Sequence, residues 1–185
     1  EIYTLSLHDA LPISRQVQAL DDYLETGIWN TLMKDHHDDY LVPNFLTADP
    51  GATLTDRGYA YPHVYNTYFE MYQIARDDPG LITYKHDPDT YLLRAYHIIK
   101  ALYDGPVNYS LSTGLMGGQT TPELIQALDR EGYVKEADDI RDKMQRKYAN
   151  FSSKKYPYGS EYSYDNTGEE EIYTLARVHW QAGQD

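Results

Sequence analysis

The sequence predicts an all-α protein in which antiparallel helical hairpins form a toroid or an open array. Apolar residues recur at spacings of three and four in six separate segments, which is the pattern of one helix face. No stretch shows the sustained alternation of apolar and polar residues that would indicate a strand. Short turns and long aromatic loops alternate between the six segments, so we expect neighbouring helices to run antiparallel.

The first three helices are predicted over residues 15–34, 62–76 and 88–104. The second begins with a proline in its first turn, where the missing N–H costs nothing. The third follows an Asp-Pro pair, which is typical of an N-cap and the first helical position. Residues 35–61 carry several prolines and glycines and are predicted as a long loop, and loops of that length are usually functional or disordered.

The second half of the chain predicts helices over residues 122–131, 133–151 and 169–182, with Thr121 as the N-cap of the first. The glycine-rich connection before Thr121 lacks the Gly-Lys-Ser/Thr ending of a phosphate-binding loop. Because only Gly132 separates the first two of these helices, residues 121–151 are predicted to form a tight helical hairpin. The side chains expected to face inward on its second helix are Val134, Ala137, Ile140, Met144 and Tyr148.

Composition and charge limit the classes of molecule that this protein is expected to bind. The net charge is −13, so the surface field repels nucleic-acid backbones and anionic lipid. No segment reaches the about 18 uninterrupted apolar residues of a membrane span. The absence of cysteine excludes disulfides and thiolate zinc sites. The 20 tyrosines combine an apolar face with a polar tip, which suits a groove for sugars.

The first fourteen residues, EIYTLSLHDALPIS, resemble the conceptual translation of a sequencing adapter rather than a natural protein segment. We therefore interpret residues 1–14 as an artefact and residues 15–185 as a partial domain whose remainder is missing. The natural N-terminus, including any signal peptide, would then be lost. This leaves the localisation open, with a secreted or periplasmic full-length protein as one option.

Carboxylates and tyrosines are densest in residues 156–173, a loop that leads into the last helix. Glycoside hydrolysis needs two carboxylates with separately tuned pKa values. Glu161 and Asp165 lie within the loop, where no helix dipole accounts for them, and they are the predicted acid and base. Glu170 is expected to orient or replace one of them. The tyrosines expected to line a sugar groove are Tyr158, Tyr162 and Tyr164.

The string YGSEYSYDNTGEEEIY resembles the motif of a carbohydrate-associated domain family of unknown function. That resemblance implies a six-hairpin, (α/α)6-toroid fold of the glycosidase type, of which this chain would supply about half. The residues that carry the resemblance are Ser160, Glu161, Asp165, Thr167, Gly168, Glu169 and Glu170.

Two further clusters of residues suggest alternative functional sites. DHHDDY at residues 35–40 has the ligand types of a divalent-metal site, but adjacent residues point apart, and a solvated helix end is the simpler interpretation. The sequence therefore predicts no metal and no cofactor. In YAYPHVYN, Tyr61 or Tyr65 could act as the base of a polysaccharide lyase with His63, or these residues could simply pack at the core edge.

We conclude from the sequence that the protein is carbohydrate-active, and we expect a glycoside hydrolase that uses Glu161 and Asp165. Tyr61 and His63 are included as further sugar-binding candidates. The alternatives are a lyase of the α/α-toroid type and a non-catalytic helical module that binds glycan or protein. The expected partner is a carbohydrate, with neither nucleic acid nor membrane.

Overall fold

The computed structural model describes residues 7–44, 54–155 and 168–182, and no strand occurs within these ranges. The all-α prediction is confirmed for this part of the chain, and each of the six predicted helices is present. In chain order the elements are α1 (Leu7–Tyr23), the π-helix η1 (Leu24–Leu32), α2 (Ala60–Asp77), α3 (Pro88–Asp104), the 3-10 turn η2 (Gly118–Thr120), α4 (Thr121–Arg130), α5 (Val134–Ser152) and α6 (Glu169–Ala182).

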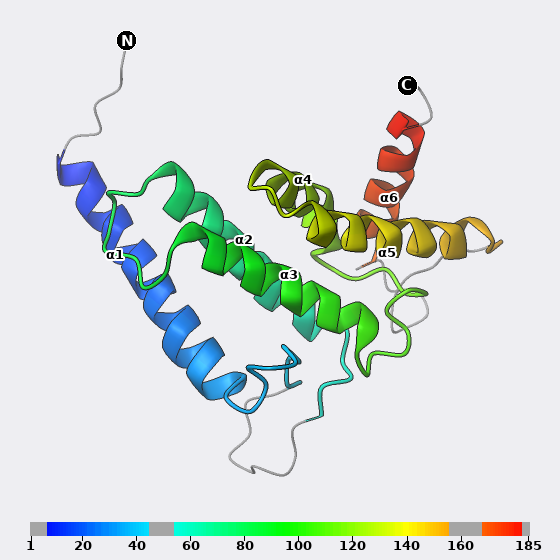
Figure 1. The fold of residues 1–185 in the computed structure, drawn as a ribbon, viewed down its shortest axis with the longest axis horizontal. Helices are drawn as coiled ribbons and strands as arrows, with labels where there is room; N and C mark the ends of the chain where they lie inside the picture. Colours follow the sequence, from blue (N-terminus) through cyan, green and yellow to red (C-terminus); the bar gives the residue numbers. More distant parts are fainter. Residues whose placement is uncertain (1–6, 45–53, 156–167, 183–185) are drawn as a thin grey trace.

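The helices pack as antiparallel hairpins, as the sequence predicts (Figure 1). α2 and α3 form the most extensive pair, and the continuous rod of α1 and η1 lies against them. α4 and α5 form the second hairpin, which contacts α3. α6 packs against α5 and η2. The connection after α4 is the shortest, at residues 131–133, and the connection after α2 spans residues 78–87. The connections after η1, α3 and α5 are longer.

Tyrosines of α2 form the centre of the core. Tyr61, Tyr65, Tyr68 and Tyr72 are fully buried because their spacing of three or four places them on one helix face. Their hydroxyl groups need partners inside the protein, and the Tyr68 hydroxyl donates to the Leu24 carbonyl oxygen at 3.3 Å. This segment therefore supplies packing, where the sequence suggested the wall of a groove.

The first helix is longer than predicted. α1 begins at Leu7 and so includes part of the segment that we interpret as adapter-derived; that interpretation stays a prediction. Its continuation η1 is π-helical, and the side chains of Asn30 and Thr31 donate to the carbonyl oxygens five residues earlier, at 2.8 and 2.6 Å. The wider turn of a π-helix brings groups five positions apart into register.

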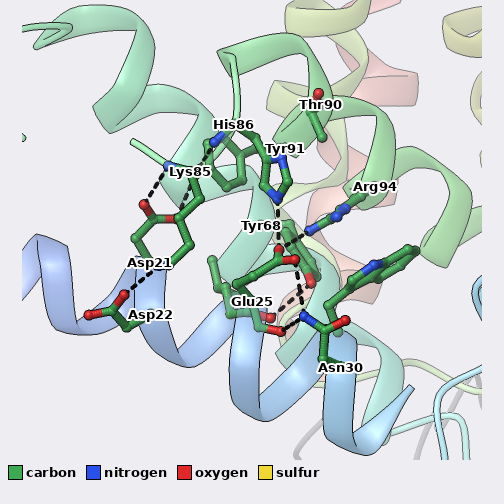
Figure 2. A network of polar contacts seen from close by, with 12 residues as sticks. Asp21, Asp22, Glu25, Asn30, Tyr68, Lys85, His86, Thr90, Tyr91 and Arg94 are labelled. Atoms are coloured by element: carbon green, nitrogen blue, oxygen red, sulfur yellow. Dashed lines mark hydrogen bonds and ion pairs between the residues drawn. The ribbon is translucent and has the colours of Figure 1, made fainter. Parts of the chain in front are cut away.

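A polar network fixes α1 and η1 to α3 (Figure 2). Glu25 lies at its centre and accepts hydrogen bonds from His86 at 2.7 Å and from Arg94 at 3.0 Å. Burial alone would raise the pKa of Glu25, but these two hydrogen bonds lower it to about 2. One turn earlier, buried Asp21 accepts from the Tyr91 hydroxyl at 2.5 Å. The network therefore fixes the position of the α1–η1 rod along the axis of α3.

The second hairpin differs from the prediction in two places. Thr121 lies inside the first turn of α4 rather than at its N-cap, because the preceding turn η2 runs directly into the helix. On α5, Val134 is 53% exposed, although we expected it to face inward. Two lysines, Lys143 and Lys147, are buried on this helix instead.

Candidate functional site

Described residues of the three long connections lie together at one end of the helices. The amide of Gly58, before α2, donates to the Tyr109 hydroxyl at 2.8 Å and so joins the first connection to the second. The second connection is joined to the third by Lys154, whose Nζ donates to the carbonyl oxygen of Ser112 at 2.8 Å. We call this end the loop face.

A fully buried ion pair lies beneath the loop face. Lys147 of α5 donates from Nζ to Glu171 Oε2 of α6 at 2.6 Å, and the two side chains are 0% and 1% exposed. The same carboxylate oxygen accepts from the backbone amide of Leu115 at 2.6 Å. Glu171 therefore joins α5, α6 and the connection after α3.

Tyrosine completes the surroundings of this pair. The Tyr103 hydroxyl lies 3.3 Å from Lys147 Nζ and 3.4 Å from Glu171 Oε1. Burial and the nearby Glu171 charge raise the pKa of Tyr103 well above its ordinary value, so it stays a neutral hydrogen-bonding group. Burial lowers the pKa of Lys147, and the Glu171 carboxylate opposes that effect. Gly118 approaches so closely that a Cβ there would lie 2.5 Å from Glu171 Cδ.

A groove of about 440 Å³ opens beside the buried pair, between α4, α5 and α6. Apolar side chains form much of its wall, together with the stacked rings of Tyr148 and His179, whose centroids are 4.0 Å apart. The polar side chains of the groove are Thr121, Gln126, Arg141, Gln145 and Thr174.

Most of the predicted acid and tyrosine cluster falls outside the described residues. These residues are Glu161 and Asp165 with Tyr158, Tyr162 and Tyr164. Glu170 is described, and its side chain is exposed in the first turn of α6. Its neighbour Glu171 lies on a different side of the helix and is buried, since adjacent helix positions differ by about 100°.

The structure separates the residues of the alternative lyase site. Tyr61 and Tyr65 lie on the buried face of α2, whereas His63 is exposed on the other side of the helix. The Tyr61 hydroxyl donates to the Thr55 carbonyl oxygen at 2.7 Å, and burial raises the pKa of Tyr61 to about 12. Burial also raises the pKa of Tyr65. Neither hydroxyl is placed to act as a base together with His63.

His63 and the histidine-rich segment 35–40 make separate sets of contacts. His63 lines a pocket of about 390 Å³ with Asn44 and Thr67, near the loop face. In the histidine-rich segment, His36 Nδ1 lies 3.0 Å from Asp39 Oδ1, while His37 stacks on Trp29 at 4.2 Å. Within the described ranges no three potential ligands gather around a metal position.

Sequence reasoning missed Lys147 and interpreted Glu171 as a first-turn acid favoured by the helix dipole, although a signal for a buried pair was present. Lys147 follows Ile140 by two helical turns, so it falls on the apolar face of α5. Glu171 is followed at three and four positions by Thr174 and Leu175, which are also buried. A charged residue on an apolar stripe indicates a buried partner, because an unpaired buried charge is costly.

The fold and the loop face define a class of protein: a helical-hairpin domain in which described residues of three long connections lie together at one end. A solved polysaccharide lyase matches 92% of this chain with a TM-score of 0.60 and 19% sequence identity. The match extends over 24% of the lyase, so this chain spans about a quarter of its length. At this identity the likeness establishes a shared fold, in agreement with the predicted all-α fold of antiparallel helical hairpins.

The chain belongs to DUF5695, a family of unknown function, whose model matches residues 48–182. The matched range includes α2 to α6 and therefore most of the loop face. No match was found among the curated proteins. None of the helices in the described part of the chain is long and apolar enough to cross a membrane.

Proposed function

We propose that this chain is the loop-bearing part of a domain that cleaves polysaccharide. The observation that carries the proposal is the pair of hydrogen bonds that join described residues of three long connections in one loop face, at the end of the packed hairpins. Loops positioned by a rigid scaffold are where catalytic and binding residues concentrate. The shared fold with a polysaccharide lyase supports carbohydrate as the class of substrate.

Hydrolysis is the first candidate reaction. Glu161 and Asp165 would act as acid and base, with Glu170 as an orienting carboxylate at the start of α6. Tyr158, Tyr162 and Tyr164 would stack against sugar rings and exclude water.

The buried pair supports this assignment indirectly. Glu171 and Lys147 fix the first turn of α6, which immediately follows the acidic loop. A reacting group has to be held within a fraction of an ångström of its productive position, and rigid support of the neighbouring backbone favours that.

Elimination is the second candidate reaction, and the fold likeness to a lyase favours it. In this case Tyr61 is a poor choice for the base, because its hydroxyl is bonded inside the core. His63 stays a candidate for sugar binding, since it is exposed and lines a pocket near the loop face. The net charge of −13 opposes binding of a polyanionic substrate, which favours hydrolysis of a neutral glycan.

The test uses the longest natural protein that contains this chain, incubated with a panel of neutral and uronate-containing polysaccharides. New reducing ends measure cleavage by either route, and absorbance near 235 nm measures the unsaturated ends that only elimination produces. We expect reducing ends without absorbance for hydrolysis. Both signals together would show that the reaction is elimination and not hydrolysis.

The variants E161Q and D165N test whether each of these two acids takes part in hydrolysis. Each is expected to lower hydrolysis by at least about 100-fold, as removal of a general acid or base does. E169Q is the control, because Glu169 is an exposed acid in the first turn of α6 and has no role in the proposed reaction. Full activity in E161Q and D165N would remove these two residues from the mechanism. Sugar binding without any cleavage by the unmodified protein would contradict the proposed reaction and favour a non-catalytic binding module.

A further inference from the structure

A third cavity, also near the loop face, has a composition unlike that of the groove beside α6. It has a volume of about 400 Å³ and lies between residues 38–41 and the C-terminal half of α3. Its polar lining includes Asp39, His97, Lys100 and Asp104. The volume falls within the range of about 300–1,000 Å³ that is typical of small-molecule sites. We call it the His97 pocket.

His97 is held between two aromatic rings. The Tyr40 ring stacks on it with centroids 4.6 Å apart and planes at 25°, and the Tyr96 ring lies 4.9 Å away. No hydrogen bond reaches either ring nitrogen from the described residues of this chain. The imidazole therefore lies between two rings, and its donor and acceptor have no partner within residues 7–44, 54–155 and 168–182.

The charge state of His97 follows from its surroundings. Burial lowers the pKa of His97, the charge of Glu136 opposes that effect, and the charge of Lys100 adds to it. A neutral imidazole has one donor nitrogen and one acceptor nitrogen. A sugar hydroxyl also donates and accepts, so the two groups are complementary.

The backbone at Tyr40 is unusual and indicates a constraint at this pocket. Tyr40 has φ +56°, a left-handed conformation that bulky residues rarely adopt. The conformation is held from both sides: the Tyr40 amide donates to the His36 carbonyl oxygen at 2.9 Å, and the Leu41 amide donates to Asp39 Oδ1 at 3.1 Å. In this conformation the ring of Tyr40 reaches His97. Such local strain is concentrated at functional sites.

Charged groups of both signs surround the open side. Lys100 pairs with Asp104, which also pairs with Lys143 at 3.2 Å. Asp39 is half exposed beside them. The lining carries the carboxylates of Asp38, Asp39 and Asp104 and the ammonium group of Lys100, so it offers several hydrogen-bond acceptors and a donor, and its net negative charge disfavours an anionic ligand. Because no three potential ligands meet in the described residues, the pocket does not have the donor set of a metal site.

We propose that the His97 pocket is a saccharide subsite, in which His97 hydrogen-bonds a hydroxyl group while Lys100 and Asp104 contact neighbouring hydroxyls. The ligand class rests on the proposed function, whereas the location rests on the pocket itself. The subsite lies beside the first and second loop-face connections, so it would extend a sugar groove along α3.

The test measures binding to the 185-residue chain with isotopically labelled histidine. The probes are neutral hexasaccharides of β-1,4-glucan, α-1,4-glucan and β-1,4-mannan. The chain has seven histidines, so their ring signals can be assigned by single substitution. We expect one of the hexasaccharides to shift the His97 ring signals and to leave those of His86 unchanged, because His86 is bonded to Glu25.

Two variants separate binding from packing. H97F keeps an aromatic ring between Tyr40 and Tyr96 but removes both nitrogens, and we expect its Kd to rise at least tenfold with little change in Tm. H97Q keeps hydrogen-bonding capacity and is expected to bind better than H97F. H179F is the matched control, since His179 is also ring-stacked but lies in the other groove.

The subsite is overturned if no hexasaccharide shifts the His97 signals, or if H97F binds as tightly as the unmodified chain. These outcomes differ from a failure of the proposed function. Cleavage by the longer protein with an unresponsive His97 would remove only the subsite. A sugar-dependent His97 shift without any cleavage would remove only the proposed reaction.

Discussion

Substitution of Lys147 by methionine tests the structural importance of the buried pair. The ammonium group of Lys147 is fully buried and bonds Glu171 at 2.6 Å. Methionine has a similar volume and fills the space of the lysine stem, so the substitution removes the charge and leaves little cavity. The carboxylate of Glu171 would then retain the Leu115 amide as its closest donor but would lack a cation.

The expected cost is large, because a buried carboxylate without its cation is poorly solvated. Removing one partner of a buried ion pair destabilises by about 3–5 kcal/mol. For a chain of this length that corresponds to a fall in Tm of about 6–20 °C. Total stabilities of domains are about 5–15 kcal/mol, so the variant would lose a substantial part of its stability.

Urea denaturation followed by circular dichroism measures the change, provided that the unfolding is two-state. The double variant K147M/E171Q is neutral at both positions, and the glutamine oxygen can still accept from Leu115. We expect the double variant to lose at least about 2 kcal/mol less than the sum of the two single variants. K135M, on the exposed side of the same helix, should change the stability by no more than about 0.5 kcal/mol.

A loss below about 1 kcal/mol in K147M would refute the reasoning, because it would mean that Glu171 finds solvent or another donor. Additive losses in the double variant would likewise show that the two charges do not interact.

Two further substitutions test the local structure. E25Q removes a carboxylate whose pKa falls to about 2 on folding, below its ordinary value of 4.5. A lowered carboxylate pKa stabilises the fold above the unfolded pKa, and that stability is lost as the pH falls from 4.5 towards 2. The stability difference between the unmodified chain and E25Q should therefore be largest at pH 7 and shrink at pH 3, measured by urea midpoints. G118A places a methyl group against the pinned Glu171 side chain and should cost about 1–3 kcal/mol, measured by thermal unfolding.

Matched variants serve as controls for these two predictions. E70Q removes an exposed carboxylate on α2, and its effect should not vary with pH in the same way. A difference for E25Q that stays constant between pH 7 and pH 3 would contradict the role of the carboxylate charge. G80A is the control for G118A, because no atom lies within 4 Å of a Cβ at Gly80. Equal stability of G118A and G80A would show that Glu171 can move aside.

The helices could be predicted from the sequence because their signals are local. The Asp-Pro pair before α3 predicts the N-cap, and the Asp87 carboxylate accepts from the Thr90 amide at 2.7 Å. The predicted bounds of α3 and α6 agree with the structure. η1 was not predicted as π-helical, because its geometry is supported by side-chain contacts across five residues rather than by apolar spacing.

The candidate site depended on contacts that local patterns do not contain. A first-turn glutamate is favoured by the helix dipole whether it is exposed or buried, so Glu170 and Glu171 look alike in the sequence. Only the position of Lys147, 24 residues earlier, distinguishes them. Likewise, His97 has no partner near it in the sequence, and Tyr40 reaches it only through the fold.

The sequence by itself determined the all-α class, the order of the helices and the alternation of short turns with long loops. Apolar periodicity and helix caps act over a few residues, so they are readable along the chain. The tertiary structure decided which tyrosines form the core, which acid is buried and where the loops meet. Those outcomes depend on desolvation and pairing between distant segments, which exist only once the hairpins have packed.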